Sequence, residues 1–161
     1  MTIEMLEQER NLARKSGNNE RLLLLNDVIA KARAKETAGK KKIELTERLV
    51  NDTLAEYYKM LKDGIKQMPV GHPVWETYNK QLEIVKELST HMMTEEWEIE
   101  NLINKVLYTN EIPVNRKNKG KMMKVLMPAL RAEYADMDVA MPIIDFMISQ
   151  AEVANGGANE K

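Results

Sequence analysis

The sequence contains no cysteine and few of the residues that build sheets or interrupt helices. Without cysteine, the chain can form no disulfide, no thiolate zinc site and no cysteine nucleophile. Aromatic residues make up only 5% of the 161 positions, and there are seven glycines and five prolines. Because sheets draw on aromatic and β-branched residues, whereas Leu, Met and Ala suit helices, this composition predicts an all-α protein.

Long apolar runs and a signal peptide are also missing. No apolar run approaches the roughly 20 residues that a membrane-spanning helix needs, and the first seven residues are acidic without an apolar segment. We therefore expect a cytoplasmic protein with no membrane contact. Apolar residues nevertheless make up 43% of the chain, and 12 of them are methionine, which is enough to fill helical cores.

Apolar spacing and capping signals predict four longer helices before about residue 92 and three shorter ones after it. The second is expected at roughly 20–36 and the sixth at 120–130. Thr46 and Thr94 are predicted N-caps, as are Asn19 and either Asp136 or Asp138, because their side chains can accept from first-turn amides.

These helices predict two domains. An N-terminal bundle of about four helices is expected over residues 1–91, and a C-terminal bundle of about three helices over residues 92–153, joined near residues 89–93. Residues 154–161 are small and polar, rich in Gly and Asn, and are predicted to form a disordered tail.

Five cations and no acid occur between residues 115 and 124. Because helix N-termini favour anions, this basic segment could hold a phosphate backbone; the alternative is a solvated loop. A second basic region is interrupted by Glu36 and Glu44, which favours a solvated face. Its cations are Lys31, Arg33, Lys35, Lys40, Lys41 and Lys42.

The two histidines, His72 and His91, have no partner at the spacing of a general base or a metal site. No glycine-rich phosphate loop is present either. We therefore expect no catalytic residue, no metal and no cofactor.

The tryptophans and the C-terminal methionines are predicted to fill the cores. Trp75 and Trp97 lie in step with the apolar stripes of their helices, and the same spacing places Leu12, Leu23 and Phe146 on inward faces. The methionines could alternatively form an adaptable binding groove; they are Met122, Met123, Met127, Met137, Met141 and Met147.

Three stretches of this chain have a familiar pattern. One is the Arg-Leu-rich segment 20–25, and another is the helix 82–88 followed by Met93-Thr94-Glu95-Glu96. The most specific is the run Lys119-Gly120-Lys121-Met122-Met123-Lys124-Val125-Leu126-Met127-Pro128-Ala129-Leu130. Together they resemble the GatB/YqeY family, small all-helical proteins related to the tail domain of the B subunit of the tRNA-dependent amidotransferase.

The resemblance implies a non-catalytic accessory module that contributes tRNA binding to glutamine-dependent amidotransferase chemistry, a carbon–nitrogen ligation with glutamine as amido donor. It implies that phosphate contacts come from Lys117, Lys119, Lys121, Lys124 and Arg131. In the family a basic turn usually follows the signature, but here residues 131–138 keep one basic residue and gain acids.

That change supports an alternative function as a protein–protein adaptor or inhibitor. Between Glu133 and Glu160 there are six acids and no Lys or Arg. Such an acidic, Met-rich surface repels phosphate and suits a basic or apolar protein partner.

Overall fold

The computed structural model describes residues 1–156, and its regular structure is helical. These residues form seven α-helices and one short 3₁₀ helix, with no strand among them. The prediction of an all-α protein is therefore confirmed. The chain divides into two compact units, one running from Met1 to His91 and the other beginning at Met92.

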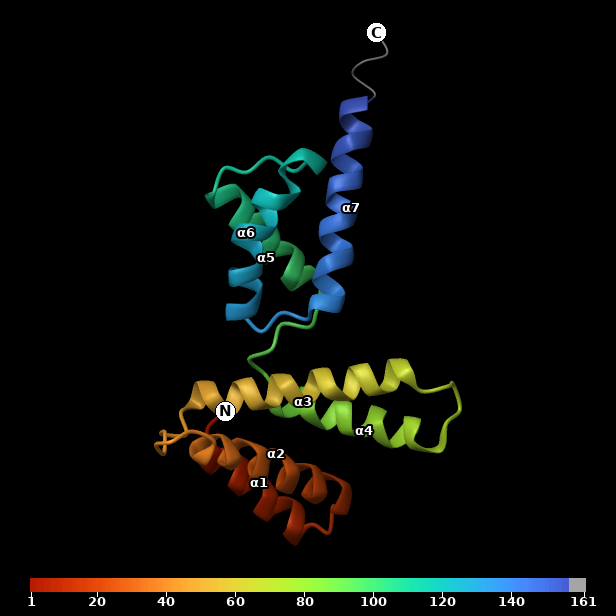
Figure 1. The fold of residues 1–161 in the computed structure, drawn as a ribbon. Helices are drawn as coiled ribbons and strands as arrows, with labels where there is room; N and C mark the ends of the chain where they lie inside the picture. The colour runs from red at the N-terminus through yellow and green to blue at the C-terminus, as the bar shows by residue number, and fades with distance from the viewer. Residues whose placement is uncertain (157–161) are drawn as a thin grey trace. The chain divides into compact units, whose positions relative to one another are not determined.

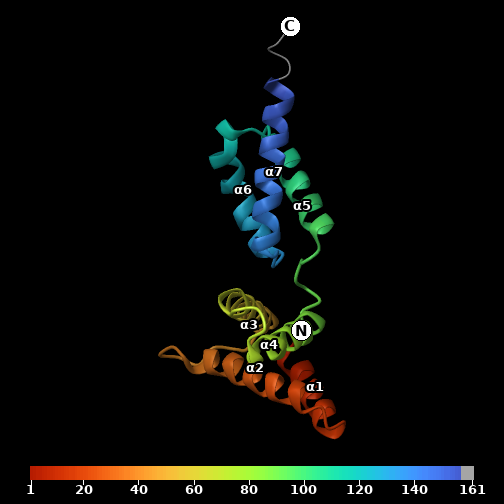
Figure 2. The same ribbon diagram turned by 90° about the vertical axis from the view of Figure 1, so that its right-hand side faces the viewer.

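The first unit contains two helical hairpins (Figures 1 and 2). Helix α1 (Ile3–Lys15) packs on α2 (Asn19–Thr37), α3 (Glu47–Gln67) packs on α4 (Pro73–Leu88), and α2 also contacts both α3 and α4. Since α2 touches the three other helices, it is the centre of this unit. Leu25 and Val28 of α2 are fully buried accordingly.

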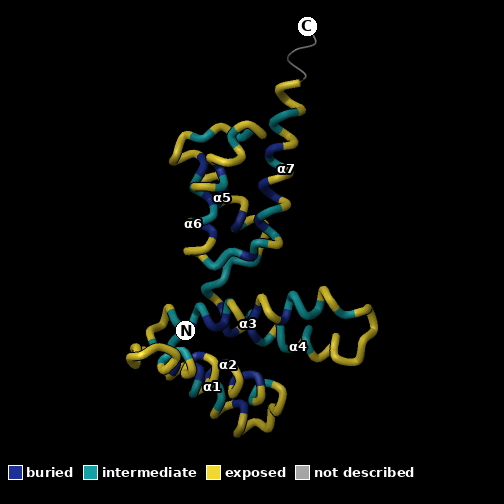
Figure 3. The backbone as a smooth tube through the Cα atoms, in the orientation of Figure 1, coloured by how far each residue is buried: buried dark blue, intermediate teal, exposed yellow. Residues whose placement is uncertain are grey.

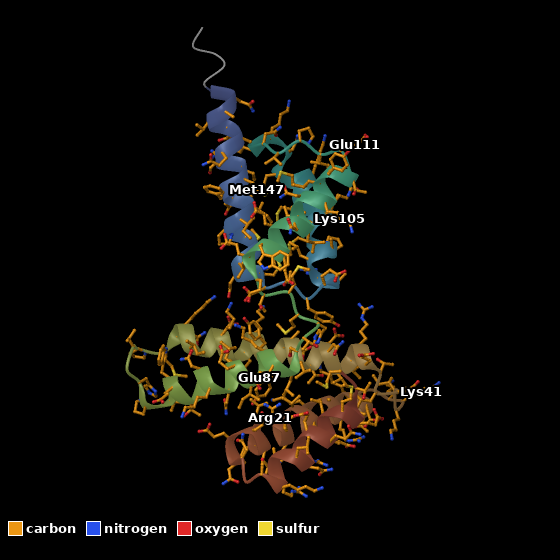
Figure 4. The ribbon with its side chains drawn as sticks, turned by 180° about the vertical axis from the view of Figure 1, so that it is seen from behind. Arg21, Lys41, Glu87, Lys105, Glu111 and Met147 are labelled. Carbon is orange, nitrogen blue, oxygen red and sulfur yellow. The ribbon has the colours of Figure 1, made fainter. Side chains whose placement is uncertain are left out.

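A surface arginine joins three of these helices. Arg21 on α2 donates to Glu9 on α1 at 2.9 Å and to Glu87 on α4 at 2.8 Å. Arg21 and Glu87 are labelled in Figure 4. Each of these partly exposed pairs contributes at most about 1 kcal/mol. The apolar core therefore supplies most of the stability, and Arg21 mainly fixes the pairing.

Local signals correctly predict several helix ends in this unit. Thr46 caps α3 by accepting from the Leu49 amide at 3.3 Å, and the break between α3 and α4 falls where Pro69 and Pro73 indicate it. The cap of α2 was predicted one residue too late. Asn18 is the N-cap and accepts from the Arg21 amide at 3.1 Å.

The second unit contains α5 (Glu96–Thr109), the 3₁₀ helix η1 (Arg116–Asn118), α6 (Lys119–Ala132) and α7 (Met137–Gly156). Helix α5 packs against both α6 and α7. Its fully buried Ile99 and Ile103 meet the buried stripe of α6 and Ile144 of α7 in one core. Figure 3 shows buried residues within these helices, and exposed and intermediate ones along the connection between α5 and α6.

Backbone pairing holds the segment before α5. The Met93 amide donates to the Tyr134 carbonyl at 3.3 Å, and the Met93 carbonyl accepts from the Asp136 amide at 2.9 Å. Thr94 was predicted to cap α5, but the N-cap is Glu95, without a side-chain cap bond. Pairing of Met93 with the α6–α7 turn sets where this helix begins.

Helix α7 begins at Met137, directly after Asp136, one of the two predicted caps; the Asp136 side chain accepts from the Asp138 amide at 3.0 Å. The helix continues to Gly156, so residues 154–156 are helical and not part of a tail. The remainder of the predicted tail, residues 157–161, lies outside the described residues.

Some apolar residues that were expected inside are exposed. Trp97 and Phe146 are each 63% exposed, Leu23 is 67% exposed and Leu12 is 58% exposed; Trp75, also predicted to fill the core, is 38% exposed. Trp97 precedes the buried Ile99 by two residues, which places it about 200° away around α5. On α2 the two residues after Leu23, Leu24 and Leu25, are buried, and Leu23 lies outside that face. Met122, in contrast, is fully buried and confirms the core role for that methionine.

Among residues 1–156, no helix is both long enough and apolar enough to cross a lipid bilayer.

The two units can be tested separately because each contains one tryptophan. Leu25 and Leu126 are both 0% exposed, so Leu25→Ala and Leu126→Ala should each lower the free energy of unfolding of its own unit by roughly 2–5 kcal/mol. Urea unfolding would be followed by Trp75 fluorescence in a Trp97→Phe background, and by Trp97 fluorescence in a Trp75→Phe background. The expected result is that each Leu→Ala change shifts only the reporter of its own unit. A shift of both reporters together would mean that the units unfold as one.

Candidate nucleic-acid interface

The two faces of α6 differ sharply in character. Met122, Leu126 and Leu130 follow one another at intervals of four and are 0% exposed, so this side of the helix lies in the core. The opposite side carries Lys121, Lys124 and Arg131, which are exposed and are spaced so that they follow one face. Lys117 of η1, also exposed, precedes them by one turn.

We call these four cations, Lys117, Lys121, Lys124 and Arg131, the basic stripe. Within residues 1–156, none of them has an ion-pair or hydrogen-bond partner. Helix α6 itself contains no acid. From Lys121 to Arg131 the stripe extends about 15 Å, at 1.5 Å per residue. That length matches several nucleotide steps along a helical strand, at about 3.4 Å each.

The other two cations of the basic segment have partners on α7. Lys119 Nζ lies 2.8 Å from Asp145 Oδ1, and Arg116 Nε lies 3.3 Å from Glu152 Oε1. The two acids are seven residues apart and so share one face of α7. Lys119 was predicted to contact phosphate together with the stripe, but it is directed at α7, where a phosphate would have to replace Asp145.

Side-chain hydrogen bonds shape the loop that leads into α6. Asn115 Oδ1 accepts from the Asn118 amide at 2.8 Å, and Asn118 Nδ2 donates to the Pro113 carbonyl at 3.1 Å. Because Asn118 uses its side chain on the preceding loop, it makes no side-chain cap bond to α6. These bonds fix the path of the loop and place Lys117 at the start of the stripe.

Two of the six cations of the second basic region are paired with acids. Arg33 pairs with Glu7 at 2.7 Å and with Glu36 at 3.3 Å, and Lys35 pairs with Glu56 at 2.7 Å. Lys40–Lys42 are exposed in the loop after α2, where Figure 4 labels Lys41. This distribution fits a solvated face of mixed charge.

The histidines differ in their surroundings. His72 is the N-cap of α4, and its Nδ1 accepts from the Val74 amide at 3.2 Å. His91 is half-buried. Burial lowers its pKa, as does the positive charge of the nearby amino terminus, while a hydrogen bond to the Asn51 backbone and the charges of Glu47 and Asp52 oppose this shift. In the described part of the chain, no three His, Asp or Glu residues gather in a way that could hold a metal ion.

Comparison with models of protein families finds none that matches this chain, and comparison with curated proteins finds no match either. The assignment of a function therefore depends on the residues themselves and on the resemblance of the three sequence stretches.

Sequence reasoning missed the two acids that pair with the basic segment. Asp145 and Glu152 lie on the polar side of α7, and their spacing of seven was visible, but nothing local shows which helix they face. It also missed the exposure of Phe146, since several positions of α7 are apolar and more than one face could have been buried.

The half-buried His91 predicts a pH dependence of stability. Its pKa in the folded state is lowered below the ordinary value of about 6.5, so the unfolded state binds the proton more readily. The free energy of unfolding of the first unit should therefore fall as the pH drops from about 7.5 through 6.5. Urea unfolding in the Trp97→Phe background, with Trp75 as reporter, would measure this decline.

The variant His91→Gln should lose the decline over this range. The variant His72→Asn retains His91 and a side-chain acceptor at the N-cap of α4, and should behave as wild type. An equal decline in His91→Gln and wild type would show that other groups cause it.

Proposed function

We propose that this chain is a non-catalytic accessory module of the GatB/YqeY type, acting in the cytoplasm, and that it binds tRNA through the basic stripe of α6. One observation carries the proposal. Three exposed cations follow one face of α6, and a fourth, Lys117, lies just before them in η1. None of the four has a partner in residues 1–156, whereas the two neighbouring cations are paired with α7.

The charge of the whole chain makes a local patch necessary. The net charge is −1, so the molecule as a whole does not attract a polyanion. Phosphate binding releases counterions for each cation that engages a phosphate. Cations that already have an acidic partner gain less from this exchange, which favours the stripe over Lys119 and Arg116.

The family assignment rests on the three sequence stretches. In a protein of this type, the module would hold tRNA while a partner enzyme performs the amide transfer from glutamine. We also propose that the two compact units are separate bundles, with four helices in the first and three in the second. In this arrangement the second bundle provides the RNA contact.

The proposal is tested by measuring tRNA affinity as a function of salt. Lys117, Lys121 and Lys124 are replaced together by Ala, and binding is followed by fluorescence anisotropy of labelled tRNA. Removing one cation that engages a phosphate should reduce the slope of log K against log salt by about one. The triple variant should therefore bind more weakly, with a slope smaller by roughly three.

The matched control removes the same charge elsewhere. Lys40, Lys41 and Lys42 are exposed and belong to the other unit, so their triple replacement by Ala should leave the slope unchanged. If both triple variants weaken binding equally, the stripe is not the site. If wild type shows no salt-dependent tRNA binding at all, the RNA proposal fails.

A further inference from the structure

A groove runs between α5 and α7 in the second unit. Its volume is about 560 Å³, within the range of sites that bind organic groups or side chains. Apolar side chains of α7, which we call the floor, and acidic side chains of both helices, which we call the rim, line this groove. The residues that matter most are Ile143, Phe146 and Met147, with Glu96, Glu100 and Asp138.

The floor exposes a large apolar side chain to water. Phe146 is the chain's one phenylalanine and is 63% exposed. Met147, labelled in Figure 4, is partly buried beside it. An exposed aromatic ring gains free energy when a partner covers it, and the flexible methionine can adjust to the shape of that partner. The floor therefore suits an apolar anchor.

The rim selects the charge of the partner. Glu96 and Glu100 lie one turn apart on α5 and are exposed, and within residues 1–156 neither has an ion-pair partner. Asp138 adds a third carboxylate on the α7 side, and no Lys or Arg lines the groove. Such a rim repels phosphate and attracts cations, so a nucleic acid or an anionic lipid surface fits it poorly.

We propose that this groove binds a basic amphipathic helix from another protein. Apolar residues of that helix, one turn apart, would cover Phe146 and Met147, while flanking Lys or Arg side chains would meet Glu96 and Glu100. Helices that dock in this way present anchors at i, i+3 or i+4, and i+7. Helix α6 lines no part of the groove, so this site is separate from the basic stripe.

A synthetic peptide tests the proposal directly. The probe is a fluorescent helix-forming peptide of about 18 residues with Leu at i, i+4 and i+7 and Lys on both flanks. A control peptide has the same sequence with every Lys replaced by Glu. Anisotropy titration with the full chain should show binding of the Lys peptide, weakened by salt, and much weaker binding of the Glu peptide.

Variants of the groove should weaken that binding. Phe146→Ala, at an exposed position, should raise the Kd about tenfold, as loss of a central anchor does. Glu96→Gln with Glu100→Gln should raise the Kd at low salt and reduce its salt dependence. Circular dichroism would confirm that both proteins keep their helices.

Matched controls change similar groups outside the groove. Val153→Ala alters a side chain that is 73% exposed on the same helix. Glu44→Gln with Glu133→Gln removes the same charge from exposed positions. Both should keep the Kd within about twofold of wild type. The triple Ala variant of Lys117, Lys121 and Lys124 should also keep it, which separates this proposal from the RNA proposal.

Three results would overturn the inference. One is equal binding of the Lys and Glu peptides by wild type, and another is a Phe146→Ala protein that binds like wild type. The third is a wild-type dimer in sedimentation that Phe146→Ala abolishes, because the occupant would then be a second copy of this chain.

Discussion

Burial of one face of α6 determines what its other face presents to solvent. Removing a Met or Leu side chain from water contributes roughly 1.5–3 kcal/mol, and Met122, Leu126 and Leu130 are all 0% exposed. Turning the helix by a single residue, about 100°, would expose them. The exposed ion pairs between this region and α7 contribute at most about 1 kcal/mol each. The core therefore fixes the direction of Lys121, Lys124 and Arg131, and the ion pairs only adjust the start of the helix.

Much of the fold could be predicted because its signals are local. A cap such as Thr46, or the pair of prolines before α4, acts within a few residues and needs no knowledge of the rest of the chain. Leu12, Leu23, Trp97 and Phe146 were misplaced because spacing identifies a candidate face but not its width. In α7, where apolar residues occur on several sides, only the contact with α5 decides which of them are buried.

The candidate site was predictable in composition but not in pairing. A run of five cations without an acid is visible in the sequence, and so is the acidic character of the last helix. Which cations are neutralised depends on the packing of α7 against η1, a tertiary contact. That packing pairs Arg116 and Lys119 and leaves the stripe unneutralised among the described residues. The acid-rimmed groove likewise arises only when α5 and α7 come together.

The prolines inside α6 and α7 allow these two helices to bend. Pro128 and Pro142 have no N–H to donate, so the carbonyls of Lys124 and Asp138, four residues earlier, lack the usual hydrogen bond from residue i+4. Lys124 is a residue of the basic stripe, and Asp138 is a residue of the groove's rim. Each helix can therefore bend at the proline, where one backbone hydrogen bond is absent, without unfolding. A bend at either proline changes the shape of the surface beside it, so each surface can adjust to the shape of a partner.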